Sequence, residues 1–342
     1  MTFVRNAWYV ASWASELTQA LQRRTILGED VVLYRTGDGA PVALRDRCPH
    51  RLLPLSKGRL IDDRVQCGYH GLVFDRSGAC VHVPGQAVIP PNARVRSYPA
   101  AERLGLIWIW MGDPDLADPA EIYDLPEYHR PEWGVAHGDA LHVKADYLLL
   151  CDNLSDPSHV EYVHPTTLGS PSSEGVGVEF EEEDWGVTTR RWSLDSEPIG
   201  FARAFGNFDG RVDRWQYYHM HTPSTAIIDF GTAPAGAGFK AKAGGFDNCI
   251  RVFSCHFMTP ETETSCYDYW LHVRNFGVDD PSVGEGISGQ FRIAFAEDKE
   301  VLEAIQCEED RFEGGTRVGL DLDAPAALFR RKIDRRVRTE AA

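Results

Sequence analysis

Two short segments near the start of the chain each contain a cysteine followed closely by a histidine. The first pair is Cys48 and His50, and the second is Cys67 and His70. Two thiolates and two imidazoles can bind one zinc ion, but zinc fingers pair cysteine with cysteine and histidine with histidine. The observed order suits a two-iron cluster in which two cysteines hold one iron and two histidines hold the other. The spacing therefore predicts a [2Fe-2S] cluster of this mixed type, with structural zinc as the alternative.

A second group of possible metal ligands begins with two histidines in the middle of the chain. His159 and His164 are five positions apart, which on a regular helix separates them by about 140° around the axis. To bind one ion, the backbone between them must loosen or end. Pro157 favours a change in the helix, because it lacks a backbone N–H and clashes with the preceding turn. Either a helix restarts here with Asp156 as its N-cap, or a continuous helix is kinked; two unconnected surface histidines are the alternative without a metal.

An acidic residue far along the chain is the candidate third ligand. The segment 287–306 is predicted to be a helix, and its apolar stripe consists of Phe291, Phe295, Leu302 and Ile305. Asp298 belongs to the same stripe, and a carboxylate facing a core is costly unless it is paired or binds a metal. His159, His164 and Asp298 would form a two-histidine, one-carboxylate triad, which suits non-haem Fe(II) and leaves positions open for O2. Pairing of Asp298 with an arginine is the alternative, and Glu297 is expected to face away from the stripe.

The composition is that of an ordinary globular protein. The chain has 342 residues, of which 43% are hydrophobic and 25% charged, and this length suggests about two domains. The formal net charge of −16 argues against binding to nucleic acids or anionic membranes. No apolar run approaches the ~18 residues of a membrane span, and no secretory signal is recognisable, so we expect a cytoplasmic protein.

The other cysteines carry no recognisable pattern. In a reducing cytosol, thiols and metal ligands are more common than disulfides. We therefore expect buried free thiols for most of the six that lack paired spacing, which are Cys80, Cys151, Cys249, Cys255, Cys266 and Cys307.

The coarse pattern along the chain predicts one domain for each of the two groups of ligands. The first third is rich in short strand-like runs, and such runs return between about 190 and 275. Prolines, aspartates and glycines dominate 112–139, which is typical of a junction. Residues 283–310 and the basic segment Arg330 to Arg338 read as helices. We therefore predict one metal domain over 1–115, a junction over 116–140 and a second metal domain over 141–342.

With both groups of ligands in view, the chain resembles the oxygenase (alpha) component of the Rieske non-haem iron oxygenases. Within that family it is most similar to the vanillate O-demethylase, dicamba O-demethylase and toluenesulfonate methyl-monooxygenase group. The motifs that carry the resemblance are Asn6–Ala11, Cys48–Arg51, Cys67–Leu72, Val83–Gln86, Trp108–Pro114, Asp152–Leu154, His164–Gly169, Thr259–Glu263 and Arg274–Phe276.

The resemblance implies an α+β fold. It consists of an N-terminal Rieske β domain and a C-terminal catalytic domain with a curved antiparallel sheet covered by helices, in a helix-grip, START-like arrangement. It also implies a head-to-tail homotrimer, in which the cluster of one subunit serves the iron of its neighbour. Asp156 would then bridge His70 and His159 across that interface, and Asn153 would lie near the iron.

The same resemblance implies a terminal monooxygenase. A flavin and iron-sulfur reductase would supply electrons from NAD(P)H, and O2 would be the co-substrate. The expected reaction hydroxylates a methyl or methoxy group of a small, anionic aromatic, which gives either O-demethylation with formaldehyde release or a benzylic alcohol. Hydroxylation of a ring or another side-chain carbon of a different scaffold is one alternative, and a Rieske electron-transfer protein without oxygenase activity is another.

The substrate pocket leaves a weaker signal in the sequence. By resemblance, His256 stands where relatives direct a polar group at the substrate, although a buried, hydrogen-bonded histidine is an equal alternative, and Ile228 is a second candidate contact. Arg203, His219 and His221 could meet an anionic substituent, and strand alternation puts the two histidines on one face. Because the whole chain is acidic, an anionic substrate would require positive charge inside the pocket.

Overall fold

The computed structural model describes residues 3–169, 175–206, 208–236 and 249–341, and it divides into two compact units. The first unit comprises Met1–Asp124 with Thr259–Glu263, and the second comprises Leu125–Met258 with Thr264–Ala342. None of the helices that the structure describes is both long and apolar enough to cross a membrane.

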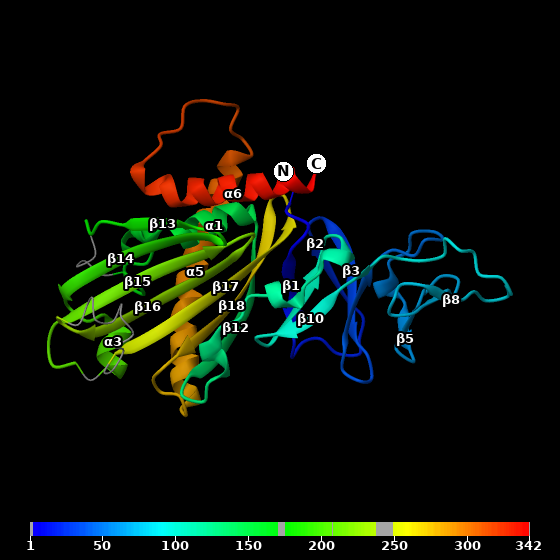
Figure 1. Cartoon of the computed structure of the whole chain (residues 1–342), viewed down its shortest axis with the longest axis horizontal. Coiled ribbons are helices and arrows are strands. Elements are labelled where there is room, and N and C mark those ends of the chain that lie inside the picture. Colours follow the sequence, from blue (N-terminus) through cyan, green and yellow to red (C-terminus); the bar gives the residue numbers. More distant parts are fainter. Residues whose placement is uncertain (1–2, 170–174, 207, 237–248, 342) are drawn as a thin grey trace. The chain divides into compact units, whose positions relative to one another are not determined.

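The first unit is built from three small antiparallel sheets (Figure 1). Their orders are β1-β11-β10, β2-β3-β4-β9 and β5-β6-β7-β8. The strands are β1 (Trp8–Trp13), β2 (Gln22–Ile26), β3 (Glu29–Arg35), β4 (Pro41–Arg45), β5 (Arg59–Ile61), β6 (Arg64–Gln66), β7 (Val73–Phe74), β8 (Cys80–His82), β9 (Ser97–Tyr98), β10 (Ala100–Arg103) and β11 (Leu106–Trp110). One core of this unit, around Val32, Tyr34, Leu44 and Phe74, includes the thiols of Cys48 and Cys67.

The second unit is organised around one antiparallel sheet of seven strands in the order β12-β18-β17-β16-β15-β14-β13. The strands are β12 (Gly134–Val143), β13 (Glu179–Glu183), β14 (Gly186–Ser196), β15 (Val212–His221), β16 (Thr225–Pro234), β17 (Ile250–Thr262) and β18 (Ser265–Arg274). The helical segments are α1 (Tyr147–Ser155), η5 (Pro157–His159), α2 (Val160–Val163), α3 (Gly200–Phe205), α5 (Pro281–Glu309), η7 (Asp321–Asp323) and α6 (Ala324–Glu340). Three short 3-10 turns precede the sheet: η2 (Pro114–Leu116), η3 (Pro119–Glu121) and η4 (Pro126–His129).

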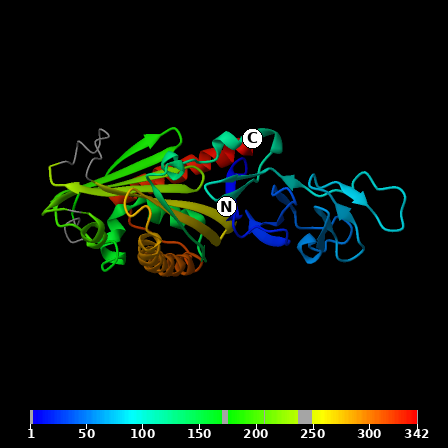
Figure 2. The same cartoon turned by 90° about the horizontal axis from the view of Figure 1, so that it is seen from below.

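The long helix α5 lies on one face of this sheet (Figures 1 and 2). Its apolar side packs against Trp270 of β18 and Phe230 of β16 through residues that include Phe291 and Phe295. Asp280 caps its N-terminus by accepting a hydrogen bond from the backbone N–H of Ser282, and Pro281 occupies the first turn. The predicted α+β fold, a small all-β unit and a large antiparallel sheet covered by helices, is confirmed.

The predicted domain limits stay a prediction. The structure shows which elements lie within the predicted junction. The segment 116–140 contains 3-10 turns, as its prolines suggest, but β12 already begins at Gly134 and pairs with β18. The edge of the large sheet therefore starts inside the segment that the sequence marks as a junction.

Two glycines of the second unit make a matched test of its packing. A Cβ atom added to Gly138, at the irregular register between β12 and β18, would lie 2.2 Å from the ring of the buried Trp270. We expect Gly138→Ala to lower the free energy of unfolding by about 1–3 kcal/mol, because a close-packed core resists added atoms. Gly289 in α5 has open space around it, so Gly289→Ala should raise stability by up to about 1 kcal/mol. Urea unfolding followed by circular dichroism measures both, and equal effects of the two variants would contradict this account of the packing.

Candidate functional site

The two Cys-His segments form loops with the same backbone pattern. The backbone N–H of Cys48 donates to the carbonyl of Leu53, and that of Leu52 donates back to the carbonyl of Cys48. The second loop repeats this arrangement around Cys67, with bonds to Leu72 and from Gly71. Leu52 and Gly71, at equivalent places, both adopt positive φ angles of 61° and 74°. Each loop therefore turns sharply and presents a cysteine and then a histidine.

Within these loops, the sulfur and nitrogen donors differ in exposure. Cys48 and Cys67 are only 2% and 3% exposed, whereas His50 and His70 lie at the surface with ring centroids 4.5 Å apart. Burial, together with the neighbouring thiol of Cys67, raises the pKa of Cys48 to about 11. Buried thiols beneath paired, accessible imidazoles are the donor set that a mixed Cys2His2 cluster requires.

A break in the helix positions the two central histidines. Helix α1 ends at Ser155, and Asp156 then caps the 3-10 turn η5, whose first residue is Pro157. The carboxylate of Asp156 accepts hydrogen bonds from both the backbone N–H and the hydroxyl of Ser158, at 2.7 and 2.8 Å. This confirms the restarted helix over the kinked one. The following helix α2 ends at Val163, and His164, its C-cap, has left the helical conformation.

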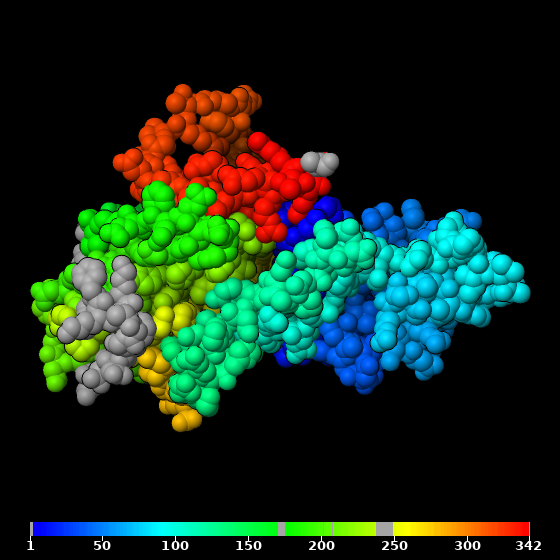
Figure 3. All heavy atoms as spheres, in the orientation of Figure 1, coloured from blue at the N-terminus to red at the C-terminus, as the bar shows by residue number. Residues whose placement is uncertain are grey.

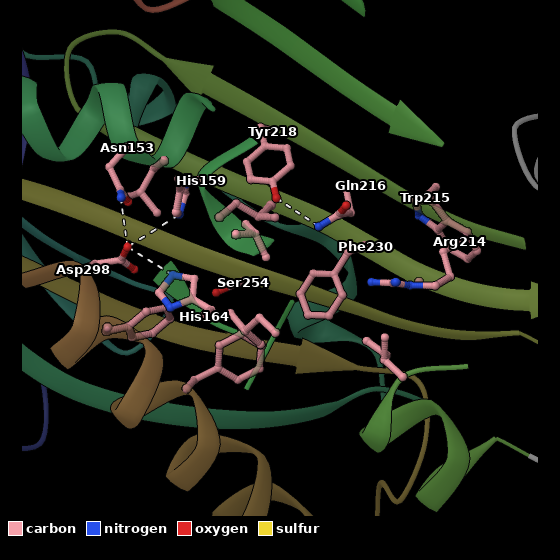
Figure 4. Close-up of a pocket in the computed structure, with 18 of the residues that line it drawn as sticks. Asn153, His159, His164, Arg214, Trp215, Gln216, Tyr218, Phe230, Ser254 and Asp298 are labelled. Carbon is pink, nitrogen blue, oxygen red and sulfur yellow. Dashed lines mark hydrogen bonds and ion pairs between the residues drawn. The ribbon is translucent and has the colours of Figure 1, made fainter. Parts of the chain in front are cut away.

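Asp298 of α5 meets both histidines at one end of a pocket (Figure 4). Its Oδ1 atom lies 3.1 Å from Nε2 of His164 and 3.5 Å from Nε2 of His159. Among the residues that the structure describes, these three form the one group of potential ligands whose donor atoms all lie within 4.8 Å of one another. Asp298 is 6% exposed and contacts imidazoles, not an arginine. Two nitrogens and one carboxylate on one side of a cavity can hold a single metal ion facially.

The other ring nitrogen of each histidine is also engaged. Nδ1 of His159 lies 2.6 Å from the backbone carbonyl of Asp156, and Nδ1 of His164 lies 2.8 Å from Oε2 of Glu297. Since a carbonyl and a carboxylate only accept, both Nδ1 atoms carry a proton, and in the neutral rings both Nε2 atoms would offer a lone pair to a metal ion. The expectation that Glu297 faces away is wrong: a side chain next to the stripe reaches round the helix to His164.

Burial and charge act differently on the two imidazoles. Burial lowers the pKa of His159, against the opposing effect of the Asp298 carboxylate. Burial also disfavours the charged form of His164, but its hydrogen bonds and charge interactions with Asp298 and Glu297 are together stronger, so its pKa is raised. His159 is thus held neutral, while His164 is the more basic of the pair.

Asn153 lies beside the triad, as the sequence predicts. Its Nδ2 atom donates to Oδ1 of Asp298 at 2.9 Å. Its Oδ1 atom is buried and has no hydrogen-bond partner among the described residues. The amide therefore fixes the orientation of the carboxylate and presents an acceptor next to the metal position.

The C-terminal helix holds the segment that carries Asn153. Arg330 of α6 forms a two-pronged ion pair with Asp152 of α1, with distances of 2.6–3.0 Å. Lys332 donates to the carbonyl of Glu183 at 2.6 Å, and the side chains of α6 cover the edge formed by β13 and β14 (Figure 3). Arg330 thus supports the segment that carries Asn153, and Lys332 attaches the same helix to the sheet.

The pocket extends from the triad across the sheet. On β15, β16 and β17 the lining residues stand in register: Tyr218 pairs with Ile228, which pairs with Ser254, and Gln216 pairs with Phe230. Phe291 and Phe295 of α5 complete an apolar wall. The predicted contact Ile228 lies in this lining.

His256 does not line the pocket but stands behind one residue that does. Its Nδ1 atom is 2.8 Å from Asp268, and its Nε2 atom is 2.9 Å from the hydroxyl of Ser254. His272, whose pKa burial lowers well below the usual range, lies 3.0 Å from the same hydroxyl. The buried, hydrogen-bonded alternative therefore describes His256, and of these side chains only that of Ser254 lines the cavity.

The three candidates for binding an anion lie elsewhere. Arg203 is exposed on α3 and pairs with Glu197. His219 and His221 share a face, as alternation predicts, but they pack against the ring of Trp185. The pocket contains a different cation, Arg214, which shares one face of β15 with Gln216 and Tyr218. Alternation groups these three residues but does not say which face of the strand lines the pocket.

Two protein-family models match separate parts of the chain. Residues 7–99 match the Rieske [2Fe-2S] domain, and residues 143–339 match the vanillate O-demethylase oxygenase C-terminal domain. The iron-sulfur subunit of the toluene-4-sulfonate monooxygenase system of Comamonas testosteroni is 39% identical over 99% of this chain and 98% of the relative. The oxygenase component of dicamba O-demethylase of Stenotrophomonas maltophilia is 38% identical over the full length of both proteins.

A solved structure extends the similarity to three dimensions. The crystal structure of dicamba monooxygenase bound to dicamba superposes with a TM-score of 0.88 and 37% identity, covering 100% of this chain and 99% of that chain. The chain thus belongs to the Rieske non-haem iron monooxygenases of the vanillate O-demethylase group, as an oxygenase component that uses a Rieske cluster and a mononuclear iron and receives electrons from a separate reductase.

Proposed function

We propose that this oxygenase component hydroxylates a methyl or methoxy group of a small anionic aromatic compound at an iron held by His159, His164 and Asp298. The observation that supports this most directly is the convergence of their three donor atoms at one end of a mainly apolar pocket. An iron ion bound there would supply O2 activation. Either formaldehyde and a phenol, or a benzylic alcohol, would be the product.

The residues around this site have separate tasks in the proposed reaction. Asp156 and Glu297 hold the protons on the Nδ1 atoms, so that both Nε2 atoms are available as ligands. Asn153 orients the carboxylate of Asp298. The aromatic and aliphatic wall excludes water and holds a flat ring against the sheet, with its methyl or methoxy group toward the triad.

We assign the Rieske cluster to Cys48, His50, Cys67 and His70. Their burial pattern supports this assignment, because the thiols are enclosed and the imidazoles are accessible. Zinc is disfavoured, since the ligand atoms of one tetrahedral zinc ion lie within about 4 Å of one another. These four residues form no such tight group of three or more in the described structure.

We also propose that subunits assemble as a homotrimer, in which the cluster of one subunit reduces the iron of the next. Asp156 would connect His70 of one copy with the ligand His159 of another. In support, Asp156 borders a groove next to the exposed side chains of Tyr162 and Phe180, which are 73% and 47% exposed. Exposed aromatic residues around a half-buried carboxylate are typical of an interface.

The location of the protein in the cytoplasm stays a prediction.

The proposed reaction predicts the products of the assembled system. With a compatible reductase, NADH and O2, the protein should release formaldehyde from a methoxybenzoate or form an alcohol from a methylarenesulfonate, as detected by chromatography. His159→Ala should abolish turnover and the mononuclear iron while the cluster spectrum is kept. Ring hydroxylation without change at the methyl group would contradict the proposal, and so would turnover by His159→Ala.

The cluster assignment predicts opposite effects for two buried cysteines of the same domain. Cys67→Ser should remove the visible absorbance and the rhombic EPR signal of the reduced cluster. Cys80→Ser is the control, because Cys80 is also buried and packs in the same core. Equal loss of the signal in both variants would contradict the assignment.

The proposed bridge predicts a purely kinetic defect for Asp156→Asn. Asparagine also caps helices, so η5 and both metal sites should form normally. Oxidation of the reduced cluster in a single turnover, followed by stopped-flow absorbance, should slow by roughly 10–100-fold. Glu300→Gln, a change of an exposed carboxylate to its amide on α5, should oxidise at the normal rate. An unchanged rate in Asp156→Asn would refute the bridge.

A further inference from the structure

Arg214 is the charged residue that β15 contributes to the far end of the pocket. Arg214, Gln216 and Tyr218 alternate along the strand and all line the cavity. Their partners on β16 are Thr232, Phe230 and Ile228. Each step of two residues advances about 6–7 Å along the strand, so Arg214 lies about 13 Å from Tyr218 along the sheet.

Arg214 and the metal triad occupy opposite ends of this cavity (Figure 4). Asp298, His159 and His164 lie at one end, and the guanidinium of Arg214 lies at the other, beyond Phe230. The walls between them are mainly aromatic and aliphatic. A flat molecule in the pocket would thus have a metal at one end and a cation at the other.

The surroundings of Arg214 favour an anion beside it. The side chain is only 5% exposed. Burial, together with the nearby guanidinium of Arg191, lowers its pKa to about 10. Among the described residues, the carboxylate of Glu161 opposes this shift, and it is bound by both terminal nitrogens of Arg191, at 2.9 and 3.1 Å. Burial and Arg191 disfavour the positive charge of the Arg214 guanidinium, and an oxyanion bound beside it would stabilise that charge.

We propose that Arg214 is the specificity-determining residue of this enzyme and binds the carboxylate or sulfonate of the aromatic substrate. The inference rests on the proposed function and adds the position and the partner of the anionic group. Guanidinium matches both oxyanions with a two-pronged hydrogen-bond geometry. Because the cation and the triad lie at opposite ends, the favoured substrates carry the anion para to the oxidised methyl or methoxy group, and ortho isomers bind less well.

The same residue explains how an acidic protein accepts an acidic substrate. The net charge of −16 repels anions, but at ordinary salt concentrations this repulsion is largely screened beyond about 10 Å. Inside the pocket, where water is largely excluded, a single guanidinium acts on the substrate with little screening. Selectivity therefore comes from one local contact and not from the charge of the whole chain.

Binding to the iron-loaded protein without O2 tests the proposal independently of turnover. Isothermal titration calorimetry would use toluene-4-sulfonate, 4-methoxybenzoate, 2-methoxybenzoate and the neutral 4-methoxybenzamide. The variants are Arg214→Gln, Arg214→Lys and the control Arg190→Gln. Arg190 lies on the neighbouring strand β14 opposite Tyr217, in the alternate position to the pocket-facing row, and pairs with Glu181.

The proposal predicts a distinct pattern in these titrations. Arg214→Gln should weaken binding of both para anions about 10–100-fold and leave the amide unchanged, because only the charge-assisted hydrogen bonds are lost. Arg214→Lys should recover part of the affinity, and Arg190→Gln should match the wild type. In the wild type, 4-methoxybenzoate should bind more tightly than its ortho isomer. Loss confined to either the sulfonate or the carboxylate would assign the site to that oxyanion.

Three results would overturn the proposal. They are unchanged binding of both anions by Arg214→Gln, equal losses for the anions and the amide, and no preference of the wild type for anions over the amide. Iron content and the cluster spectrum of each variant show that it is folded. If the wild type still oxidises anionic aromatics at their methyl or methoxy groups, the proposed function stands and only the role of Arg214 fails. If it oxidises no methyl or methoxy group, the proposed function itself fails.

Discussion

The catalytic unit depends on the placement of one carboxylate in an apolar helix face. Asp298 lies on α5 in the same stripe as Phe291 and Phe295, where an ionised side chain without partners would cost several kcal/mol. Two imidazoles and an amide, all from residues 153–164, surround it. Because the Asp298 carboxylate requires these partners, α5 is held against that segment, and their contacts form one end of the pocket.

That link also accounts for irregular features around the site. A continuous helix would direct His159 and His164 to different sides, so the chain uses a cap at Asp156, a 3-10 turn and a four-residue helix instead. The carbonyl of Asp156 and the carboxylate of Glu297 then fix which nitrogen of each ring carries the proton. Arg330 of α6 binds Asp152, the residue before Asn153, and so holds the start of this segment. The interruption of the helix between α1 and His164 is thus what allows the two histidines to face the same carboxylate.

Much of this arrangement could be predicted from residue types and spacing. The proline before His159 and the carboxylate of Asp298 inside an apolar stripe are local signals, and the structure brings His159, His164 and Asp298 together. The two Cys-His pairs are also local signals, and their role as cluster ligands stays a proposal. Contacts that depend on the tertiary fold were less accessible. Glu297 looked like a residue facing solvent, because helical periodicity describes where a Cβ points and not how far a long side chain reaches.

The pocket shows the same limit more clearly. His219 and His221 were correctly placed on one face of a strand, but nothing local indicates which face of β15 meets α5. The packing of Trp185 against both histidines puts them outside the pocket, so the adjacent alternation of Arg214, Gln216 and Tyr218 lines it. His256 likewise lies behind the cavity lining, and Ser254, two residues earlier and hydrogen-bonded to it, reaches the cavity.

The separation of the ligands along the chain has a consequence for biosynthesis. The four residues assigned to the cluster lie in two loops within β4 to β7, whereas Asn153 and Asp298 are 145 positions apart, with all but one strand of the large sheet between them. A growing chain can therefore complete the cluster loops long before α5 leaves the ribosome, and contacts between distant segments form late. Cofactor loading acquires an order: the cell can insert the iron-sulfur cluster during translation, but the second iron has no binding site until nearly the whole protein has been made.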